Sequence, residues 1–443
     1  FGCMRPDGLL SAAQKGAGSR ERLFSPLITF WAFLSQVLSP NSACRESVRK
    51  VQAWWTLRHM VEMSPHTSAY CQARSRLSDK TLAGIHTHLA ERMQANAPSA
   101  SRWFSREVKI VDGTNLSMPD TAPNQAAYPQ SSNQKEGCGF PMMKLVGLFS
   151  LKSGALLHFA HGTLHLHENQ LFRQLWHYLG KGDVILSDRG FCSFFAIASL
   201  LQRGVDSVMR LHQARRVDFR KGKRLGQDDL LLTWKKPAQP TAAWSQEEFA
   251  ALPESLTLRQ IRLQVNLQGC RSRTIILVTT LLDPVAYPAD AIRSLYLERW
   301  SVELHFREIK IVLALDVLRC LSPKMIEKEL LLHVIAYNLI RSLMQHAAIC
   351  HCVELRRISF KGTLDTLRHF ADVIHAAHGK PRKQAALLDV MLQLIAKDQL
   401  PVRLARNEPR AKKRRAKNYH LLTKPRHEMR VPPHRNRPKT RLS

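Results

Sequence analysis

Three carboxylic acids that lie far apart in the sequence have the positions expected of a metal site. Asp112 and Asp188 each end a short apolar segment with the composition of a buried strand. Glu303 lies on a predicted helix. An acid at a strand end often serves only to hydrogen-bond the local backbone, so neither aspartate indicates a site by itself. Together, the three acids offer the oxygen ligands that a hard divalent cation prefers.

The predicted helix from Ala289 to about Leu315 carries four chemically active side chains. Tyr296, Glu303 and Lys310 follow one another at intervals of seven, which is close to two helical turns. Arg299 precedes Glu303 by four residues and is expected on the same face. This face would present a hydroxyl, a guanidinium, a carboxylate and an ammonium group. The alternative is a solvent-exposed face on which Arg299 and Glu303 form an ordinary salt bridge.

The spacing Tyr-x2-Arg-x3-Glu-x6-Lys resembles the signature of transposases in the insertion-sequence family numbered four. It is found here at Tyr296, Arg299, Glu303 and Lys310. The likeness covers roughly residues 20 to 350. Other segments that resemble the family are Asp112-Gly113-Thr114, Asp188-Arg189-Gly190-Phe191, residues 25 to 38 and Tyr337 to Arg341.

The resemblance implies a DDE-type DNA transposase that cleaves DNA at transposon ends and transfers the strands into target DNA by cut-and-paste transposition. It implies a ribonuclease-H-like core in which Asp112, Asp188 and Glu303 are the catalytic residues and the metal ligands. In-line attack on a phosphodiester needs two hard cations about 3.5–4 Å apart. We therefore expect two Mg²⁺ ions, for which Mn²⁺ can substitute.

The resemblance also implies that Tyr296, Arg299 and Lys310 bind DNA. Arginine would grip a phosphate as a two-pronged fork, and lysine would act as a point charge. In similar transposases, an aromatic residue of the insertion can stack on a flipped base. Trp234 and Trp244 lie in the corresponding region, although a tryptophan there is more often part of a core. Recognition of two terminal inverted repeats predicts a dimer on DNA.

The charge of the chain agrees with a DNA partner. The formal net charge is +31, from 66 Lys and Arg against 35 Asp and Glu, and such an excess favours a polyanion. Residues 401–443 hold 15 Lys or Arg and two acids, so we expect a basic, disordered tail there.

The composition also limits the location of the protein. No apolar run approaches the roughly 20 residues of a membrane span, so no membrane partner is expected. The nine cysteines are scattered and form no Cys-x-x-Cys pair, which argues against a disulfide framework or a zinc ribbon. These features predict a cytoplasmic protein that associates with the nucleoid through DNA.

The order of apolar segments predicts an α/β fold, a mixed sheet covered by helices. Residues 20–100 are expected to form a helical DNA-binding region, although a helical packing domain would look the same. A catalytic core is predicted over 105–350, with a β-rich insertion at about 213–273. A helical region over 351–400 follows. The predicted element order in the core up to Leu211 is βββαβαβ, and a second long helix is expected from Pro323 to Ala348.

Several other residues are also candidates for a functional site. His165 and His167 would share one face of a strand, but no further ligand is in register, so a helix cap or polar strand end is favoured. Lys144 and Arg189 are basic residues beside predicted strands. Asp120 is the acid to test if Asp112 proves dispensable.

Two other functions remain open at this point. One is a related metal-dependent nuclease that cuts without strand transfer. The other is a non-catalytic or decayed DNA-binding protein. The intact acids argue against decay of the site, whereas a chain that begins at Phe1 instead of Met suggests truncation at its start.

Overall fold

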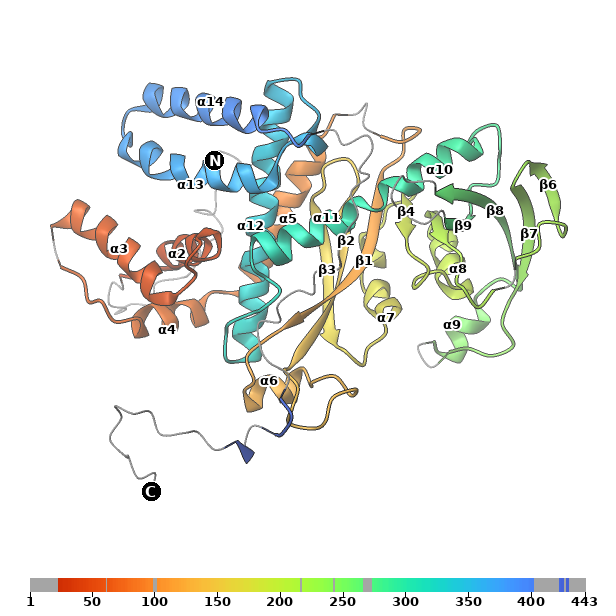
Figure 1. Cartoon of the computed structure of the whole chain (residues 1–443), viewed down its shortest axis with the longest axis horizontal. Coiled ribbons are helices and arrows are strands. Elements are labelled where there is room, and N and C mark those ends of the chain that lie inside the picture. The colour runs from red at the N-terminus through yellow and green to blue at the C-terminus, as the bar shows by residue number, and fades with distance from the viewer. Residues whose placement is uncertain are drawn as a thin grey trace.

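A nine-stranded mixed sheet forms the centre of the computed structural model (Figure 1). The structure describes residues 23–60, 62–98, 102–215, 217–241, 244–265, 273–401, 422–425 and 428–429. The strands of the core are β1 (Val108–Ser117), β2 (Met142–Ser150), β3 (Leu156–Thr163), β4 (Val184–Ser187) and β5 (Asp206–Arg210). Those that follow are β6 (Lys223–Gly226), β7 (Asp229–Lys235), β8 (Ser255–Val265) and β9 (Arg273–Thr279). The strand order is β3-β2-β1-β4-β5-β9-β8-β7-β6.

The pairing pattern confirms the expected ribonuclease-H-like core. β1, β2 and β3 form an antiparallel meander, and β1, β4 and β5 are parallel. A helix follows β3 and another follows β4, as the predicted order βββαβαβ requires: α7 (Glu168–Arg173) and α8 (Phe194–Gln202). A short helix that the sequence did not predict, α6 (Ala122–Ala127), lies between β1 and β2.

β1 is longer than the predicted segment, which ended at Asp112. The strand continues because Gly113 to Ser117 still pair with β2, although Leu116 is the only apolar side chain in this stretch. On its other side, β1 pairs with β4 only as far as Ile110 with Leu186. Asp112 therefore lies in the middle of a strand, just beyond the point where its parallel neighbour ends.

The β-rich insertion extends the core sheet instead of forming a separate one. β9 pairs antiparallel with β5, and β8, β7 and β6 follow outward. The short helix α9 (Gln246–Ala250) joins β7 to β8. Arg259 on β8 is fully buried and pairs with Asp229 through both prongs of its guanidinium, at 2.8 and 2.6 Å. It also donates to the carbonyl of Tyr287 at 2.7 Å, which fastens the insertion to the segment just before the helix that begins at Ala289.

Alternating side chains divide the core into two layers. Ile110, Leu145 and Leu186 belong to an apolar cluster shared with the helices before and after the sheet. Their neighbours Val111 and Val146 face α7 and α8. This alternation follows from the two-residue period of a strand. Both faces of the sheet are thus covered.

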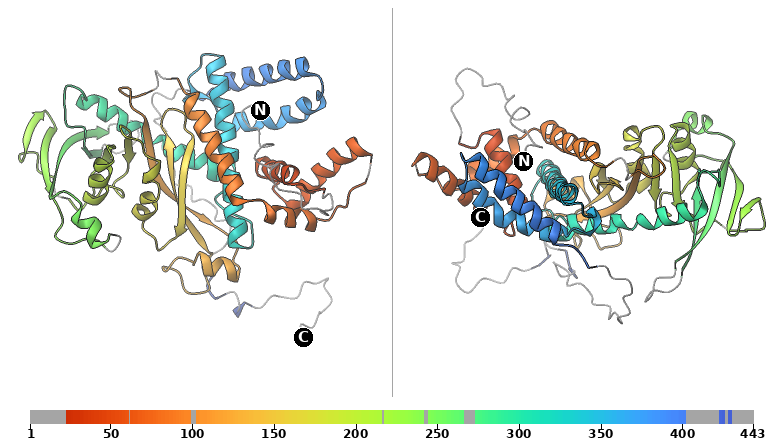
Figure 2. Two further views of the ribbon diagram at one scale, coloured as in Figure 1. Left: turned by 180° about the vertical axis from the view of Figure 1, so that it is seen from behind. Right: turned by 90° about the horizontal axis from the view of Figure 1, so that it is seen from above.

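Helices surround the sheet on its β3 side (Figure 2). Those before the sheet are α2 (Pro26–Leu38), α3 (Cys44–His59), α4 (Ser68–Arg76) and α5 (Asp79–Ala95). The helices after it are α12 (Pro323–Cys350), α13 (Phe360–Ala376) and α14 (Pro381–Lys397). α5 packs along α12, while residues of α2, α3 and α4 also share a smaller apolar cluster of their own. No helix in the described parts of the chain is both long and apolar enough to cross a membrane.

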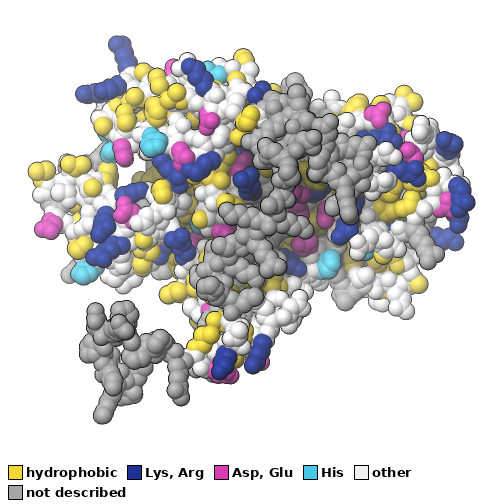
Figure 3. Space-filling model, in the orientation of Figure 1, with side chains coloured by type: hydrophobic (Ala, Val, Ile, Leu, Met, Phe, Trp, Pro, Cys, Tyr) yellow, Lys and Arg dark blue, Asp and Glu magenta, His cyan; other side chains and the backbone are white. Residues whose placement is uncertain are grey.

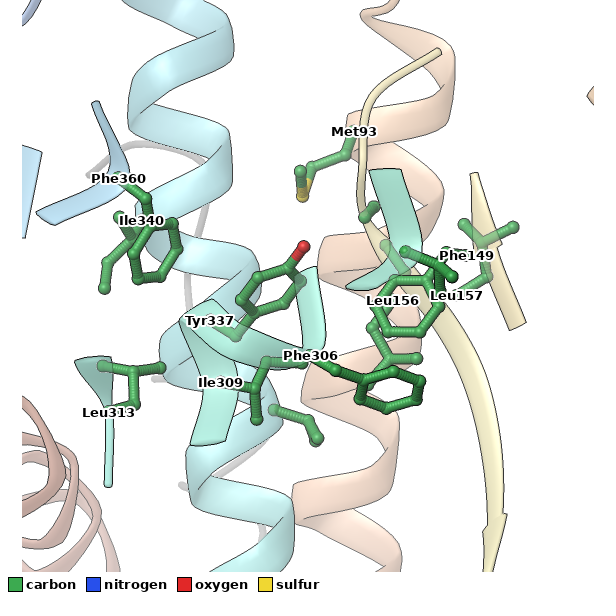
Figure 4. Close-up of a cluster of buried hydrophobic side chains, with 14 of the residues drawn as sticks. Met93, Phe149, Leu156, Leu157, Phe306, Ile309, Leu313, Tyr337, Ile340 and Phe360 are labelled. Carbon is green, nitrogen blue, oxygen red and sulfur yellow. The ribbon is translucent and has the colours of Figure 1, made fainter. Parts of the chain in front are cut away.

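The Tyr337 to Arg341 segment, to which the sequence assigned no chemistry, holds the β2–β3 turn. Asn338 accepts from the Leu156 amide and donates to the Leu156 carbonyl, both at 2.9 Å. The Tyr337 hydroxyl donates to Gly154 O at 2.7 Å, and Arg341 donates to Ser153 O at 3.0 Å. Figure 4 shows Tyr337 among the apolar side chains between α12 and the sheet. α12 is therefore bonded to the core as well as packed on it.

We expect Asn338→Ala to lower the free energy of unfolding by about 2 kcal/mol, because the buried Leu156 amide loses its partner. Urea unfolding of the purified protein measures this. Asn133→Ala, the same change at an exposed loop position, is the control and should change stability by less than about 0.5 kcal/mol. Equal stabilities of the two variants would show that the Asn338 bonds contribute little.

Candidate active site

Asp112 is largely buried beside the end of β4. Its Oδ1 accepts from the amide of Gly113 at 2.8 Å. Burial raises the pKa of Asp112 to about 6, with the carboxylates of Asp188 and Glu168 adding to the rise. The Gly113 amide and the Arg299 guanidinium oppose it. A carboxyl with a raised pKa beside other acids is typical of catalytic sites.

Asp188 directly follows β4 and holds the turn there. Its Oδ1 accepts from the amide of Gly190 at 2.8 Å, which is the local turn bond that an aspartate often makes. Phe191 is fully buried and anchors the turn in the core. Asp188 is nonetheless one of the charges that act on Asp112, so the fold brings the two predicted aspartates together.

The single long helix predicted from 289 to 315 is wrong, because the structure has three shorter segments. α10 (Ala289–Glu298) is followed by a tight turn, then by α11 (Ser301–Arg307) and the π-helical segment η3 (Glu308–Val312). At the turn, backbone bonds join residues three apart, as from Val302 N to Arg299 O. In η3 they join residues five apart, as from Leu313 N to Glu308 O. The regular helical spacing assumed in the prediction is therefore interrupted twice between Tyr296 and Lys310.

The four signature side chains consequently have different environments. Tyr296 is 2% exposed, and burial raises its pKa to about 12. The side chain of Arg299 is 8% exposed, whereas that of Glu303 is 67% exposed. The ammonium group of Lys310 donates to the hydroxyl of Thr114 at 2.9 Å and to Asn115 O at 3.0 Å. The expected polar face therefore has a buried part, Tyr296 and Arg299, and an exposed part at Glu303.

Arg299 joins the helical part of the site to the sheet. Its Nη1 lies 3.5 Å from Asp112 Oδ2, and its Nη2 lies 3.7 Å from Glu303 Oε1. The guanidinium is also 5.7 Å from the ring centre of Tyr296. Its buried Nε has no hydrogen-bond partner. The i, i+4 pair with Glu303 is present, but a buried guanidinium that also faces Asp112 is not an ordinary surface salt bridge.

The structure adds an acid that the sequence analysis did not select. Glu168 is the first residue of α7 and one of the charges acting on Asp112. His167 caps this helix, accepting from the amide of Asn169 while Gln170 bonds back to the His167 amide. The expected cap role of His167 is therefore confirmed. The signal for Glu168 was its place directly after a capping residue, but only the fold shows which side chains it approaches.

Other sequence candidates have structural partners. Lys144 donates to the carbonyls of Leu164 and Leu166 at 3.0 and 2.6 Å. Arg189 donates to Gln213 at 2.6 Å. These bonds hold loops. Asp120, the alternative to Asp112, accepts a hydrogen bond from the side-chain amide of Gln125 at 2.5 Å. The side chain of His165 is exposed.

The two tryptophans of the insertion are packed against arginines. Trp234 is buried, and the guanidinium of Arg215 lies 3.6 Å from its ring centre. Trp244 is half-buried and stacks on Phe195, with Arg173 at 4.5 Å from its ring centre. A base could stack on Trp234 only if Arg215 moved away.

The side chains of Asp112, Asp188 and Glu303 suit a hard divalent cation, because such a cation prefers carboxylate oxygens as ligands. In the part of the chain that the structure describes, however, no group of three His, Cys, Asp or Glu side chains is arranged to hold one ion. Arg299 lies between Asp112 and Glu303. A complete set of ligands would need the exposed Glu303 side chain to turn toward Asp112.

Known proteins are similar to this chain over most of its length. The family model "Transposase DDE domain" matches residues 103–339. The transposase InsG for insertion sequence element IS4 of Escherichia coli (strain K12) is 27% identical over 356 residues, which is 80% of this chain and 77% of InsG. Among solved structures, a piggyBac transposase synaptic complex with hairpin DNA aligns over 88% of this chain and 81% of its own, with a TM-score of 0.42 and 12% identity.

The family match spans more than half of the chain and includes the whole site from Asp112 to Lys310. The similarity to the IS4 transposase agrees with the resemblance to the insertion-sequence family numbered four. The chain therefore belongs to the transposase DDE domain family, whose members cleave DNA, transfer its strands and depend on divalent metal ions.

Proposed function

We propose that Asp112, Asp188 and Glu303 are the catalytic acids of this transposase and that they hold two Mg²⁺ ions, which Mn²⁺ can replace. The observation that supports this most strongly is the buried Arg299, which faces both Asp112 and Glu303. It gathers acids from the sheet and from the helix at one place. Bound divalent ions would supply activation of water or a 3′-hydroxyl and stabilisation of the leaving oxygen.

The residues of the chain then have separate tasks. Asp112 and Asp188 stand at fixed points of the sheet, and Glu303 closes the site from α11. Arg299 and Lys310 neutralise backbone phosphates near the cut, with the unpartnered Nε of Arg299 as one free donor. Tyr296 supports Arg299 through its ring. Because Tyr296 is only 2% exposed, support of Arg299 fits this side chain better than direct contact with DNA.

The proposed substrates are the terminal inverted repeats of the element and a target DNA, joined by cut-and-paste transposition. Two ends must be held together, so we propose a dimer on DNA. Lys and Arg side chains spread over the face in Figure 3, from the helical part to the edge of the insertion. This agrees with the net charge of +31 and with binding through backbone phosphates. A DNA substrate would place the protein at the nucleoid, in the cytoplasm.

The helical region over 20–100 is proposed to bind the transposon ends. Its described part carries exposed Arg45, Arg49 and Lys50 near the start of α3. The basic tail predicted over 401–443 lies almost wholly outside the described residues. Terminal inverted repeats bracketed by short direct repeats in the DNA flanking the gene would support this function. Cleavage of those repeats by the purified protein with Mg²⁺ would test it, and absence of any metal-dependent cutting would contradict it.

The raised pKa of Asp112 predicts a pH-dependent effect of Asp112→Asn on the metal-free protein. The folded pKa of about 6 exceeds the ordinary value of 3.8. Stability from this group is therefore present below about pH 4 and is lost as the pH rises to about 6. Asparagine does not ionise. The variant should gain stability relative to the parent between pH 4 and 7, on the order of 2 kcal/mol.

Urea unfolding in a chelating buffer at several pH values measures this difference. Asn133→Ala removes no ionisable group and should show the same difference from the parent at every pH. A constant difference for Asp112→Asn as well would mean that Asp112 has no raised pKa.

A further inference from the structure

A fourth carboxylate lies where two glycines leave room for it. A Cβ atom built on Gly113 would come within 2.5 Å of Glu168 Oε1 and 2.8 Å of its Cδ. A Cβ atom built on Gly190 would lie 3.1 Å from Asp188 Oδ1 and 3.9 Å from Glu168 Oε2. The Glu168 carboxylate thus adjoins the residue after Asp112 and also the turn after Asp188.

Several bonds fix the position of Glu168. Its helix begins with the His167 cap described above. The side chain of Asn169 donates to Gly190 O at 3.0 Å, which ties α7 to the Asp188 turn. Lys144 holds the chain just before α7 through the carbonyls of Leu164 and Leu166. This much support is what an acid needs if it must keep one orientation beside two others.

The surroundings of Glu168 contain polar groups without protein partners. The basic side chain of the same helix, Arg173, pairs with Glu248. The Oδ1 atom of the neighbouring Asn169 is buried and has no hydrogen-bond partner. On the Asp112 side, the Nε of Arg299 is likewise unpartnered, in a side chain that is 8% exposed. The Asn169 oxygen can accept a hydrogen bond from an ion-bound water, and the Arg299 Nε can donate to an anionic ligand at the same site, so a bound ion with its ligands would supply both missing partners.

We propose that Glu168 is a fourth carboxylate of the divalent-metal site, acting beside Asp112 and Asp188, directly or through an ion-bound water. The inference rests on the proposed function, because it takes Asp112 and Asp188 as metal ligands. Without a cation, three acids at one place repel each other, and this costs stability. With a cation, the same acids gain binding energy. Glu168 should therefore weaken the metal-free fold and strengthen metal binding.

The test compares Glu168→Gln with the parent in the full-length protein, with Mn²⁺ as the probe. Mn²⁺ binding is followed by calorimetry, and thermal unfolding is followed in a chelating buffer. We expect the dissociation constant for Mn²⁺ to rise about tenfold or more. The melting temperature of the metal-free protein should stay the same or rise. If Glu168 only stabilised the start of its helix, the melting temperature would fall and Mn²⁺ affinity would not change.

Asp79→Asn is the matched control, since Asp79 is also an acid at the first position of its helix, α5. It should leave Mn²⁺ affinity at the parent value. Gly113→Ala is a second variant, which displaces the Glu168 carboxylate without removing it. It should weaken Mn²⁺ binding, and the double variant Gly113→Ala with Glu168→Gln should bind no more weakly than the weaker single variant.

Asp112→Asn separates failure of this inference from failure of the proposed function. If Asp112→Asn loses Mn²⁺ affinity while Glu168→Gln binds like the parent, the role of Glu168 is refuted and the metal site stands. If both variants bind Mn²⁺ like the parent, the metal site at Asp112 and the role of Glu168 are refuted together.

Discussion

Asp112→Asn, Asp188→Asn and Glu303→Gln should each reduce cleavage of transposon-end DNA by about a thousandfold or more while DNA binding is largely retained. Each change keeps the size of the side chain but removes the negative charge that a hard cation requires. As the proposed ligands of one metal site, the three acids would act as one unit, so loss of any one should cost nearly as much as loss of all three. Cleavage is measured on labelled end DNA with Mg²⁺, and binding is measured by gel shift at one salt concentration.

Glu298→Gln is the control for this set. Glu298 is the last residue of α10 and pairs with Arg356 at 3.2 Å, on a side chain that is exposed. Its variant should cut DNA at the parent rate. Normal cleavage by any one of the three carboxamide variants would remove that acid from the site, and loss of cleavage in Glu298→Gln would point to a general effect on the helix.

Arg299→Ala should reduce cleavage on the order of a hundredfold. The guanidinium is buried next to both Asp112 and Glu303, and a fixed cation in a water-poor site is worth far more than one at the surface. Arg299→Lys should recover part of this loss, because a lysine supplies the charge but not the fork. Cleavage rates at saturating DNA, with gel shifts to separate binding from catalysis, measure both effects.

Arg356→Ala is the matched control, an arginine that also pairs with a carboxylate, that of Glu298 at the end of α10, but is 67% exposed. It should change cleavage by less than about twofold. A parent-like rate in Arg299→Ala would mean that Arg299 only fills space. Complete recovery in Arg299→Lys would mean that its two-pronged geometry is not used.

The sequence predicted the core sheet well because each strand is a local pattern. The segments at β2 and β4 are mostly apolar runs, and the segment at β8 alternates apolar with polar residues, which are the local patterns of buried and half-buried strands. Asp112 was identified as a site residue although the predicted strand ended there, whereas β1 continues to Ser117. Pairing of Gly113 to Ser117 with β2 depends on a partner more than 20 residues away, and a stretch with Leu116 as its single apolar side chain gives little local sign of it.

Features that depend on distant partners could not be predicted from local patterns. Regular helical spacing placed Tyr296 and Glu303 on one face, whereas the turn at Arg299 buries one and exposes the other. Arg299 meets Asp112 across 187 residues of sequence. Glu168 was not selected, because the preceding His167 suggested only a helix cap, and His167 does cap the helix. Only the folded arrangement shows that the acid after the cap approaches both aspartates.

The most direct test of the central claim is an assay for joined products. The purified protein is incubated with Mg²⁺, DNA carrying both transposon ends and a separate target DNA, and the products are resolved by size and sequenced across the junctions. The account predicts that the parent cleaves both ends and covalently joins them to the target, and that Asp188→Asn yields neither product. Cleavage without joining would indicate a nuclease, and DNA binding without any cleavage would indicate a non-catalytic protein; either result would contradict the account.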